Sequence, residues 1–291
     1  REAAEQSMVL LTNNGVLPLS TRQLNNKTLA VIGQLADQAC LGDHGSSRVS
    51  PPYTVSILQG IQQLAGELIH TVFCDGSSRD EAVALARRAD VVILVAGYHA
   101  EDEGENLTSN RKPVANPKVP RGGDRASLTL SGTDESLIAA VCAANARTIV
   151  TIIAGSAVMM HRWQQLPAAI VWAGYPGMEG GNAVARLLLG EVNPSGKLPF
   201  TIPADETQLP AFDCWATTAQ YSYFHGYSLL DEQRSTPAFA FGFGLSYTTF
   251  TLAVSPLVRA IFSAEDVIAV TVTVRNTGQH AGAEVLQCYA G

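Results

Sequence analysis

Hydrophobic residues occur along this chain in two alternating patterns. Continuous apolar runs rich in Val and Ile occur at Thr28–Gly33, His70–Cys74, Asp90–Gly97, Thr148–Gly155 and Ala168–Gly174. Between them, apolar residues recur at i, i+3 and i+4 in Val55–Gly66, Asp80–Ala89, Thr133–Asn145 and Glu179–Gly190. The continuous runs are typical of strands buried on both faces, and the spaced pattern predicts helices that connect them. The predicted fold class is therefore α/β, with a mostly parallel sheet covered by helices.

The two ends of the chain depart from this repeat. Arg1–Asn13 shows helical spacing and stops at the turn signal Asn14-Gly15, so an opening helix is predicted. After residue 248, apolar and polar residues alternate in Thr251–Pro256, Asp266–Thr277 and Ala283–Gly291. Alternation predicts β-strands, but a complete β-sandwich needs about seven of them. We therefore expect the C-terminal part to be the beginning of a truncated β-sandwich.

Composition and charge exclude several classes of partner. The 291 residues carry a formal net charge of −7 and include 46% hydrophobic residues, so a core is easily built but basic clusters for nucleic acid are absent. No apolar run reaches the ~18 residues of a membrane span. The five cysteines show neither a CxxC pair nor metal-ligand spacing, so buried free thiols are expected, and no metal and no cofactor. The expected partners therefore include no nucleic acid and no membrane.

The segment between the third apolar run and the next helical pattern, which we call the acidic loop (residues 98–132), carries candidate chemistry. Four acids occur in its first turn: Glu101, Asp102, Glu103 and Glu105. Carboxylates held together at the end of a buried strand raise one another's pKa, which can keep one of them protonated as a general acid near neutral pH. The alternative is a solvated acidic surface loop without chemistry. Spacing alone does not choose among the four acids.

A second long segment, the Gly/Ser loop (residues 41–54), follows the first strand-like run. Because ligands of open α/β sheets bind at the carboxyl ends of the strands, both loops are expected at the same site. Ser46, Ser47 and Arg48 could donate hydrogen bonds to a ligand's hydroxyl groups, or the loop could be a Gly-permitted turn whose Asp43 and His44 bond local backbone. A phosphate cradle is a weaker alternative, because neither GxGxxG nor GxxxxGK occurs.

Several segments, in order along the chain, resemble the second domain of family 3 glycoside hydrolases. The matching segments are VLLTNNGVLPL, LGDHGSSRVSPPYTVSILQGI, DEGEN, YPGMEGGNAVARLLLGEVNPSGKLPFTIP and FGFGLSYTTF. Together they span nearly the whole chain. The resemblance implies an α/β sandwich domain at residues 1–205, a connecting segment at 206–248 and an incomplete fibronectin type III-like domain at 249–291.

The same resemblance implies part of a retaining, β-glucosidase-like enzyme that hydrolyses terminal β-linked sugars. Glu103, followed by Gly104, stands where the family has its acid/base Glu, while the nucleophilic Asp belongs to a barrel domain of the same full-length protein. Ser46 and Arg48 are the expected substrate-binding residues. The carbohydrate and the barrel domain are thus the expected partners, and this fragment alone is expected to be inactive.

The sequence also departs from the family pattern. Many members read EGxDR contiguously, whereas here an insertion that contains Pro113, Pro117 and Pro120 separates Glu103-Gly104 from Asp124 and Arg125. Asp124 and Arg125 are expected to brace the loop. Ser228 stands where related sequences often have Arg. A non-catalytic carbohydrate-binding or assembly module of the same fold is the alternative function. A nucleotide-binding domain is disfavoured, because four carboxylates occur where phosphates would dock.

Overall fold

The computed structural model describes residues 1–42, 48–99, 102, 127–211, 216–218, 220–257, 263 and 265–289. Its main sheet has the strand order β1-β6-β5-β4-β2-β3, and all neighbours are parallel except β1 and β6. The strands are β1 (Val9–Asn13), β2 (Thr28–Ile32), β3 (His70–Cys74), β4 (Val91–Gly97), β5 (Thr148–Ile153) and β6 (Ala169–Trp172). The predicted α/β fold class is confirmed, and each of the five continuous apolar runs forms a strand.

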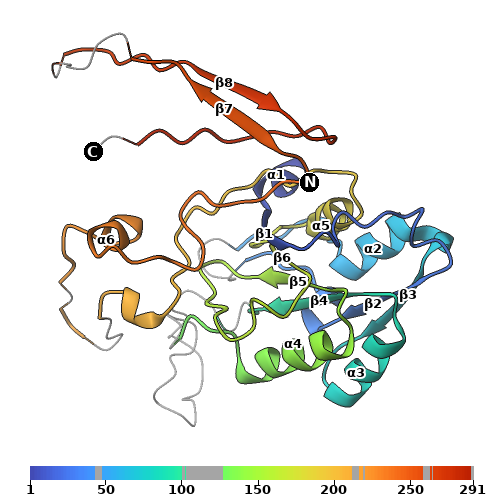
Figure 1. Cartoon of the computed structure of the whole chain (residues 1–291). Coiled ribbons are helices and arrows are strands. Elements are labelled where there is room, and N and C mark those ends of the chain that lie inside the picture. The colour runs from blue at the N-terminus through green and yellow to red at the C-terminus, as the bar shows by residue number, and fades with distance from the viewer. Residues whose placement is uncertain are drawn as a thin grey trace.

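Helices cover both faces of this sheet (Figure 1). On one face lie α1 (Glu2–Ser7), α2 (Ile57–Ala65) and α5 (Gly180–Leu188), and on the other lie α3 (Arg79–Arg88) and α4 (Gly132–Ala144). Short 3-10 turns occur at η1 (Gln34–Asp37), η2 (Gly66–Leu68) and η3 (Glu206–Gln208). Along β4, Val91, Ile93 and Val95 pack into the core under α2 and α5, and Val92 and Leu94 pack into the core over α3 and α4. Burial on both faces explains why the strand sequences are continuously apolar.

Serine side chains fix where three of these helices begin. Ser56 caps α2 by accepting a bond from Gln59 N at 3.2 Å, and the Gln59 side chain accepts from Ser56 N at 2.9 Å. The Ser78 and Ser131 hydroxyls cap α3 and α4 by accepting bonds from Glu81 N and Asp134 N. Such caps satisfy backbone donors that have no partner within the helix. The local sequence therefore sets the residue at which each of these three helices begins.

The prediction of an opening helix over Arg1–Asn13 is wrong in its second half. The helix α1 ends at Ser7, and Met8 has the extended angles φ −69° and ψ 137°. The following residues form β1, which pairs antiparallel with β6 and is completely buried from Val9 to Leu11. A short apolar run fits either helix or strand, and here the free edge of β6 decides the outcome.

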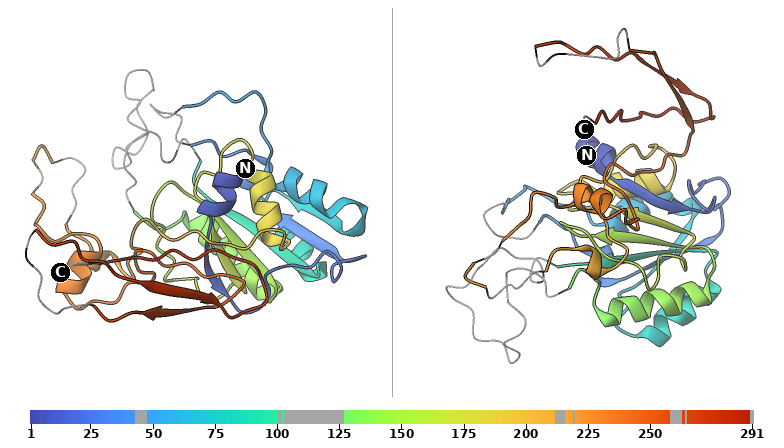
Figure 2. Two further views of the ribbon diagram at one scale, coloured as in Figure 1. Left: turned by 90° about the horizontal axis from the view of Figure 1, so that it is seen from above. Right: turned by 60° about the vertical axis from the view of Figure 1, so that its left-hand side comes forward.

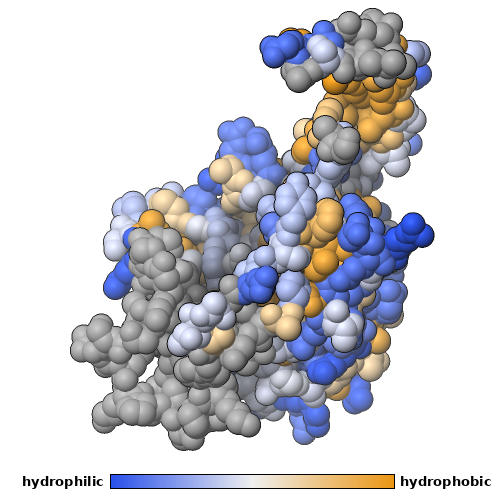
Figure 3. Space-filling view, turned by 90° about the vertical axis from the view of Figure 1, so that its left-hand side faces the viewer, coloured by the Kyte–Doolittle hydropathy of each residue, from blue (hydrophilic) through white to orange (hydrophobic). Residues whose placement is uncertain are grey.

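The C-terminal residues form a separate antiparallel pair, β7 (Phe250–Val254) and β8 (Val272–Asn276). Figures 1 and 2 show this pair beside the α/β unit rather than within its layers. Only part of the expected strand Asp266–Thr277 is formed, and the described residues of Ala283–Gly291 contain no strand. Exposed apolar side chains gather on this part of the molecule (Figure 3), among them Leu252, Val254, Ile268 and Val274. The domain boundaries given above remain a prediction.

Within the described residues, no helix has the length and apolar character needed to cross a membrane. Four cysteines of that part of the chain are free thiols: Cys142 is buried, Cys40 and Cys74 are partly buried, and Cys288 is exposed. The expectation of buried thiols is thus confirmed in full for Cys142 alone.

Candidate functional site

The sheet has one point at which successive crossovers leave in opposite directions. From β2 the chain passes through α2 to β3 on one side, whereas β4 lies on the other side of β2 and leads through α4 to β5. Ligands of open α/β sheets bind at the carboxyl ends of the strands at such a switch point. A cavity of about 440 Å³ opens there, and its walls come from the segments that follow β2, β4 and β6. It is lined by Leu35, Gln38, Ala39, Cys40, Leu41, Gly42, Tyr98, His99, Asp102 and Tyr175.

Glycines end the two strands that flank this cavity. Gly33 follows β2 with φ +114°, and a Cβ there would lie 2.1 Å from the carbonyl oxygen of Val95. Gly97 ends β4 with φ +149°, and its Cβ would lie 1.9 Å from the carbonyl oxygen of Ile153. No other residue type fits such a backbone approach at positive φ. These two glycines therefore allow both segments to turn out of the sheet at the cavity.

The first turn of the acidic loop is held by two reciprocal bonds. The backbone N–H of Asp102 donates to the carbonyl oxygen of His99 at 2.9 Å, and the backbone N–H of His99 donates to Oδ2 of Asp102 at 2.9 Å. Short polar side chains often close a turn in this manner. The turn fixes Asp102 at the rim of the cavity, directly after β4.

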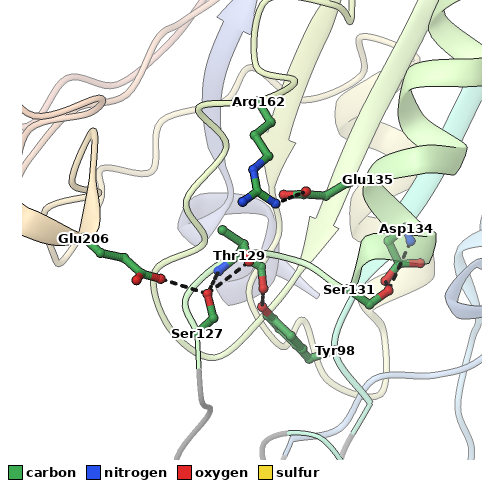
Figure 4. Close-up of polar contacts among 8 residues, drawn as sticks. All are labelled: Tyr98, Ser127, Thr129, Ser131, Asp134, Glu135, Arg162 and Glu206. Carbon is green, nitrogen blue, oxygen red and sulfur yellow. Dashed lines mark hydrogen bonds and ion pairs between the residues drawn. The ribbon is translucent and has the colours of Figure 1, made fainter.

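The end of the acidic loop returns to the same place (Figure 4). The Tyr98 hydroxyl donates to the carbonyl oxygen of Thr129, so the first and last parts of the loop are joined. Nearby, the Ser127 hydroxyl donates to Oε1 of Glu206 at 2.9 Å, and the carbonyl oxygen of Leu128 accepts from Met159 N at 2.8 Å. These contacts hold residues 127–129 against η3 and against the segment after β5.

The Gly/Ser loop is anchored at both ends as well. At its start, Gly177 N donates to the carbonyl oxygen of Cys40 at 3.3 Å, and at its end Val55 N donates to the carbonyl oxygen of Met178 at 2.9 Å. The Tyr53 hydroxyl donates to the carboxylate of Glu179, the residue that precedes α5. The stretch that precedes α5 therefore positions this loop beside the acidic one.

Cys40, Glu179 and Asp134 at this edge have shifted pKa values that bear on their chemistry. Burial raises the pKa of the Cys40 thiol to about 11, so it stays protonated and is a poor nucleophile near neutral pH. Hydrogen bonds from Asn182 and then Tyr53 lower the pKa of Glu179, which therefore stays ionised and cannot donate a proton. Burial, opposed by the bond from Ser131, raises the pKa of Asp134.

Asp134, in the first turn of α4, interacts electrostatically with His99 and Asp102 at the start of the acidic loop. The positive charge of protonated His99 would lower its pKa, whereas the carboxylate of Asp102 raises it. Its Oδ2 accepts the Ser131 hydroxyl at 2.9 Å, and its N–H donates back to that hydroxyl at 3.1 Å. A proton is thus retained more readily here than on an isolated Asp, within the field of Asp102. Among the described residues no cluster of three possible metal ligands occurs.

The structure describes some of the predicted site residues but not others. Glu103 and Ser46 lie outside the described residues, as do Glu101, Glu105, Asp43, His44, Ser47, Asp124 and Arg125. Arg48 is exposed and is not part of the cavity wall. Asp102 does line the cavity, so the sequence placed the start of the acidic loop at the expected edge. The assignments of Glu103, Ser46 and Arg48 remain predictions.

The sequence did not single out His99 and Asp134 as residues of this edge, although the position of each along the chain is informative. His99 lies two residues beyond the end of a buried strand, where functional side chains of α/β sheets gather. Asp134 stands three residues after Ser131, which is the spacing of a helix cap and gave it a purely local explanation. The hydroxyl of Ser228, where the resemblance leads us to expect Arg, donates to the carbonyl oxygen of His225 at 2.8 Å.

Comparison with known proteins agrees with this architecture. Residues 8–247 match the Glycosyl hydrolase family 3 C-terminal domain. A β-xylosidase of Formosa agariphila is 34% identical over an alignment of 310 positions, gaps included, which covers 99% of this chain and 39% of that protein. A β-glucosidase of Bacteroides ovatus is 31% identical, covering 100% of this chain and 41% of the relative. The solved structure of a β-D-glucoside glucohydrolase from Trichoderma reesei has a TM-score of 0.80 and 27% identity, covering 96% of this chain and 42% of that one. The chain thus spans about two fifths of the length of these proteins.

Proposed function

Since this chain belongs to glycoside hydrolase family 3, we propose that it contributes the acid/base carboxyl group of a retaining β-glycosidase that removes terminal β-linked sugars. Glu103 is the proposed acid/base. The nucleophilic Asp is proposed to lie on a barrel domain of the full-length protein, outside these 291 residues. The relatives named β-glucosidase and β-xylosidase support a β-linked sugar as the substrate class.

One observation carries the proposal. Asp102, the residue directly before Glu103 in the chain, lies on the cavity at the switch point of the sheet. That cavity is where the fold gathers ligand-binding groups, and both loops that carry the predicted site residues leave from its walls. A retaining glycosidase needs two carboxyl groups about 5 to 5.5 Å apart on the two sides of the sugar. A carboxyl group that extends from this edge toward an opposing domain would meet that requirement.

Electrostatics at this edge favour a proton donor. An acid/base residue must be protonated when it delivers its proton to the departing oxygen, and ionised when it activates water. Glu101, Asp102 and Glu105 are close to Glu103 in the sequence, and acids held close together raise one another's pKa. Among the described residues, burial raises the pKa of Asp134 and the carboxylate of Asp102 adds to this shift. Ser46 and Arg48 are proposed to donate hydrogen bonds to sugar hydroxyls once the barrel domain closes the site.

The proposal is tested in the full-length protein with Glu103→Ala. Substrates with poor leaving groups should lose far more rate than activated aryl glycosides, because a stable phenolate departs without a proton. Azide should restore part of the rate by attacking the glycosyl-enzyme intermediate, which then lacks its base. Glu105→Ala is the matched control: it removes a neighbouring acid, but it should show neither the selective loss on poor leaving groups nor rescue by azide. Equal loss on both substrate classes, without rescue by azide, would assign the acid/base role to another residue.

A further inference from the structure

A second and larger hollow lies away from the cavity at the switch point. It has a volume of about 1170 Å³ and lies between α6 (Tyr227–Glu232) and residues 199–203. Its walls carry the aromatic rings of Tyr223, Phe224, Tyr227, Phe241 and Tyr289. We call this hollow the aromatic groove. None of its lining residues has a role in the function proposed above.

The rings of the groove are exposed to solvent although they contact one another in two groups, Tyr223 with Phe224, and Tyr227 with Phe241 and Tyr289. Tyr223 is 89% exposed and Tyr289 is 60% exposed. The Tyr227 ring lies 5.2 Å from Phe241 at 30° and 5.9 Å from Tyr289 at 78°, measured between ring centroids. Exposed apolar surface that is gathered rather than scattered marks a binding site. The groove therefore presents several ring faces, at different inclinations, to one ligand.

Hydrogen bonds fix part of this surface in advance. The Tyr289 hydroxyl donates to Oε1 of Gln287 at 2.6 Å, and Nε2 of Gln287 donates to the carbonyl oxygen of Gly242 at 3.0 Å. At the start of α6, the Ser228 hydroxyl closes the turn by bonding to His225. Side chains that are already ordered lose less entropy on binding. Part of the groove is thus ordered before a ligand binds.

Charge narrows the class of ligand. The groove contains the carboxylates Asp231 and Glu232 and contains neither Lys nor Arg among its lining residues. Anionic ligands such as phosphates or uronic acids are therefore disfavoured. Tyrosine hydroxyls and carboxylates bond readily to hydroxyl groups, and ring faces pack against the C–H faces of pyranose sugars. The combination favours a neutral, polyhydroxylated chain.

The groove is connected to the returning end of the acidic loop. Gln208 and Leu209 line it, and η3, which contains Gln208, also contains Glu206. Glu206 accepts the hydroxyl of Ser127 at 2.9 Å, as Figure 4 shows. A ligand in the groove would therefore lie against the same element that holds the acidic loop.

From these observations we infer that the aromatic groove is a binding site for neutral oligosaccharide chains, separate from the site of hydrolysis. Sugar rings stack on Tyr223, Tyr227 and Tyr289, and Asp231 and Glu232 accept hydrogen bonds from their hydroxyls. The groove would hold a distal part of a polysaccharide near the enzyme. This binding uses no atom of Glu103, so its test is independent of the catalytic assignment.

The test is a calorimetric or NMR titration of the 291-residue chain with cellohexaose, xylohexaose and hexagalacturonate. The two neutral chains should bind and the polyanion should not. Tyr223→Ala should weaken binding by about tenfold, as expected for the loss of an aromatic anchor, and Tyr223→Phe should retain it. Tyr223 is so exposed that its removal leaves the fold intact. The matched control is Tyr221→Ala, a 62% exposed tyrosine outside the groove, which should bind like the parent chain.

Further measurements distinguish binding in the groove from catalysis, and a sugar from other ligands. Glu103→Ala should leave the titration unchanged, so that a failure of either proposal is visible without the other. Resonances of Tyr227 and Tyr289 should shift on addition of xylohexaose or cellohexaose. The inference is overturned if neither neutral chain binds, or if binding survives Tyr223→Ala and Tyr227→Ala together. In either case a polypeptide segment, rather than a sugar, is the occupant that fits these rings.

Discussion

The bond from the Tyr98 hydroxyl to Thr129 should control how often the returning end of the acidic loop detaches from the sheet. Tyr98 is only 8% exposed, so the change Tyr98→Phe keeps the ring packed and removes the donor alone. The Thr129 carbonyl then loses this partner, at a cost of about 1 to 2 kcal/mol. Local opening of residues 127–131 should become about 5 to 30 times more frequent.

Native-state hydrogen exchange measures this opening at one amide in particular. The amide of Met159 donates to Leu128 across the junction, so its protection depends on the returning segment being docked. Its exchange should accelerate by that same factor in Tyr98→Phe, while amides of β4 and β5 change only with global stability. The matched control is Tyr247→Phe, whose hydroxyl donates to the carbonyl oxygen of Leu187 elsewhere in the fold. Unchanged exchange at Met159, or equal acceleration in the control, would refute the reasoning.

Three further outcomes are expected. The 291-residue chain should not hydrolyse nitrophenyl β-glycosides above a Glu103→Ala background, and turnover above it would place the nucleophile within this chain. Gly97→Ala should lower the free energy of unfolding by at least ~2 kcal/mol in urea titrations, because its Cβ would overlap Ile153, whereas Gly132→Ala meets no atom within 4 Å and should be neutral or slightly stabilising. Burial raises the pKa of Asp134 above its usual value of 3.8. The protonated carboxyl therefore stabilises the folded state fully below pH 3.8, and this contribution is lost as the pH rises through the raised pKa. The unfolding free energy of the parent chain relative to Asp134→Asn should therefore fall between pH 3.8 and the raised pKa of Asp134, and stay constant above that pKa. A difference that does not depend on pH would contradict this.

The strands could be predicted because their burial leaves only one suitable pattern. Val91 to Ala96 is apolar at every position because residues on both faces enter a core, and the helices between such runs have their own caps. The segment Met8–Leu11 could not be assigned in this way, since its partner on β6 lies far along the chain and only the assembled sheet shows the free edge. Local pattern therefore identified the parallel strands and missed the antiparallel one.

The candidate site was predictable to a similar extent. The position of Asp102 follows from chain order, because it comes directly after a strand whose carboxyl end must lie at the ligand-binding edge. The meeting of His99, Asp102 and Asp134 depends on where the chain returns after residue 126, which no spacing in the sequence expresses. The aromatic groove likewise combines residues 199–203 with Tyr289, a proximity that only tertiary packing creates.

The antiparallel strand β1 also has a consequence for synthesis of the protein. Its residues leave the ribosome well before β6, their partner in the sheet, which is completed only at Trp172, and before Leu245, which bridges the outer side of β1. Until then a strand of buried residues has no place to pair, and exposed strand edges invite association between chains. The nascent chain must therefore keep Val9–Asn13 unpaired until β6 has been synthesised. A version of the protein that lacks these residues would leave the edge of β6 permanently open to other molecules.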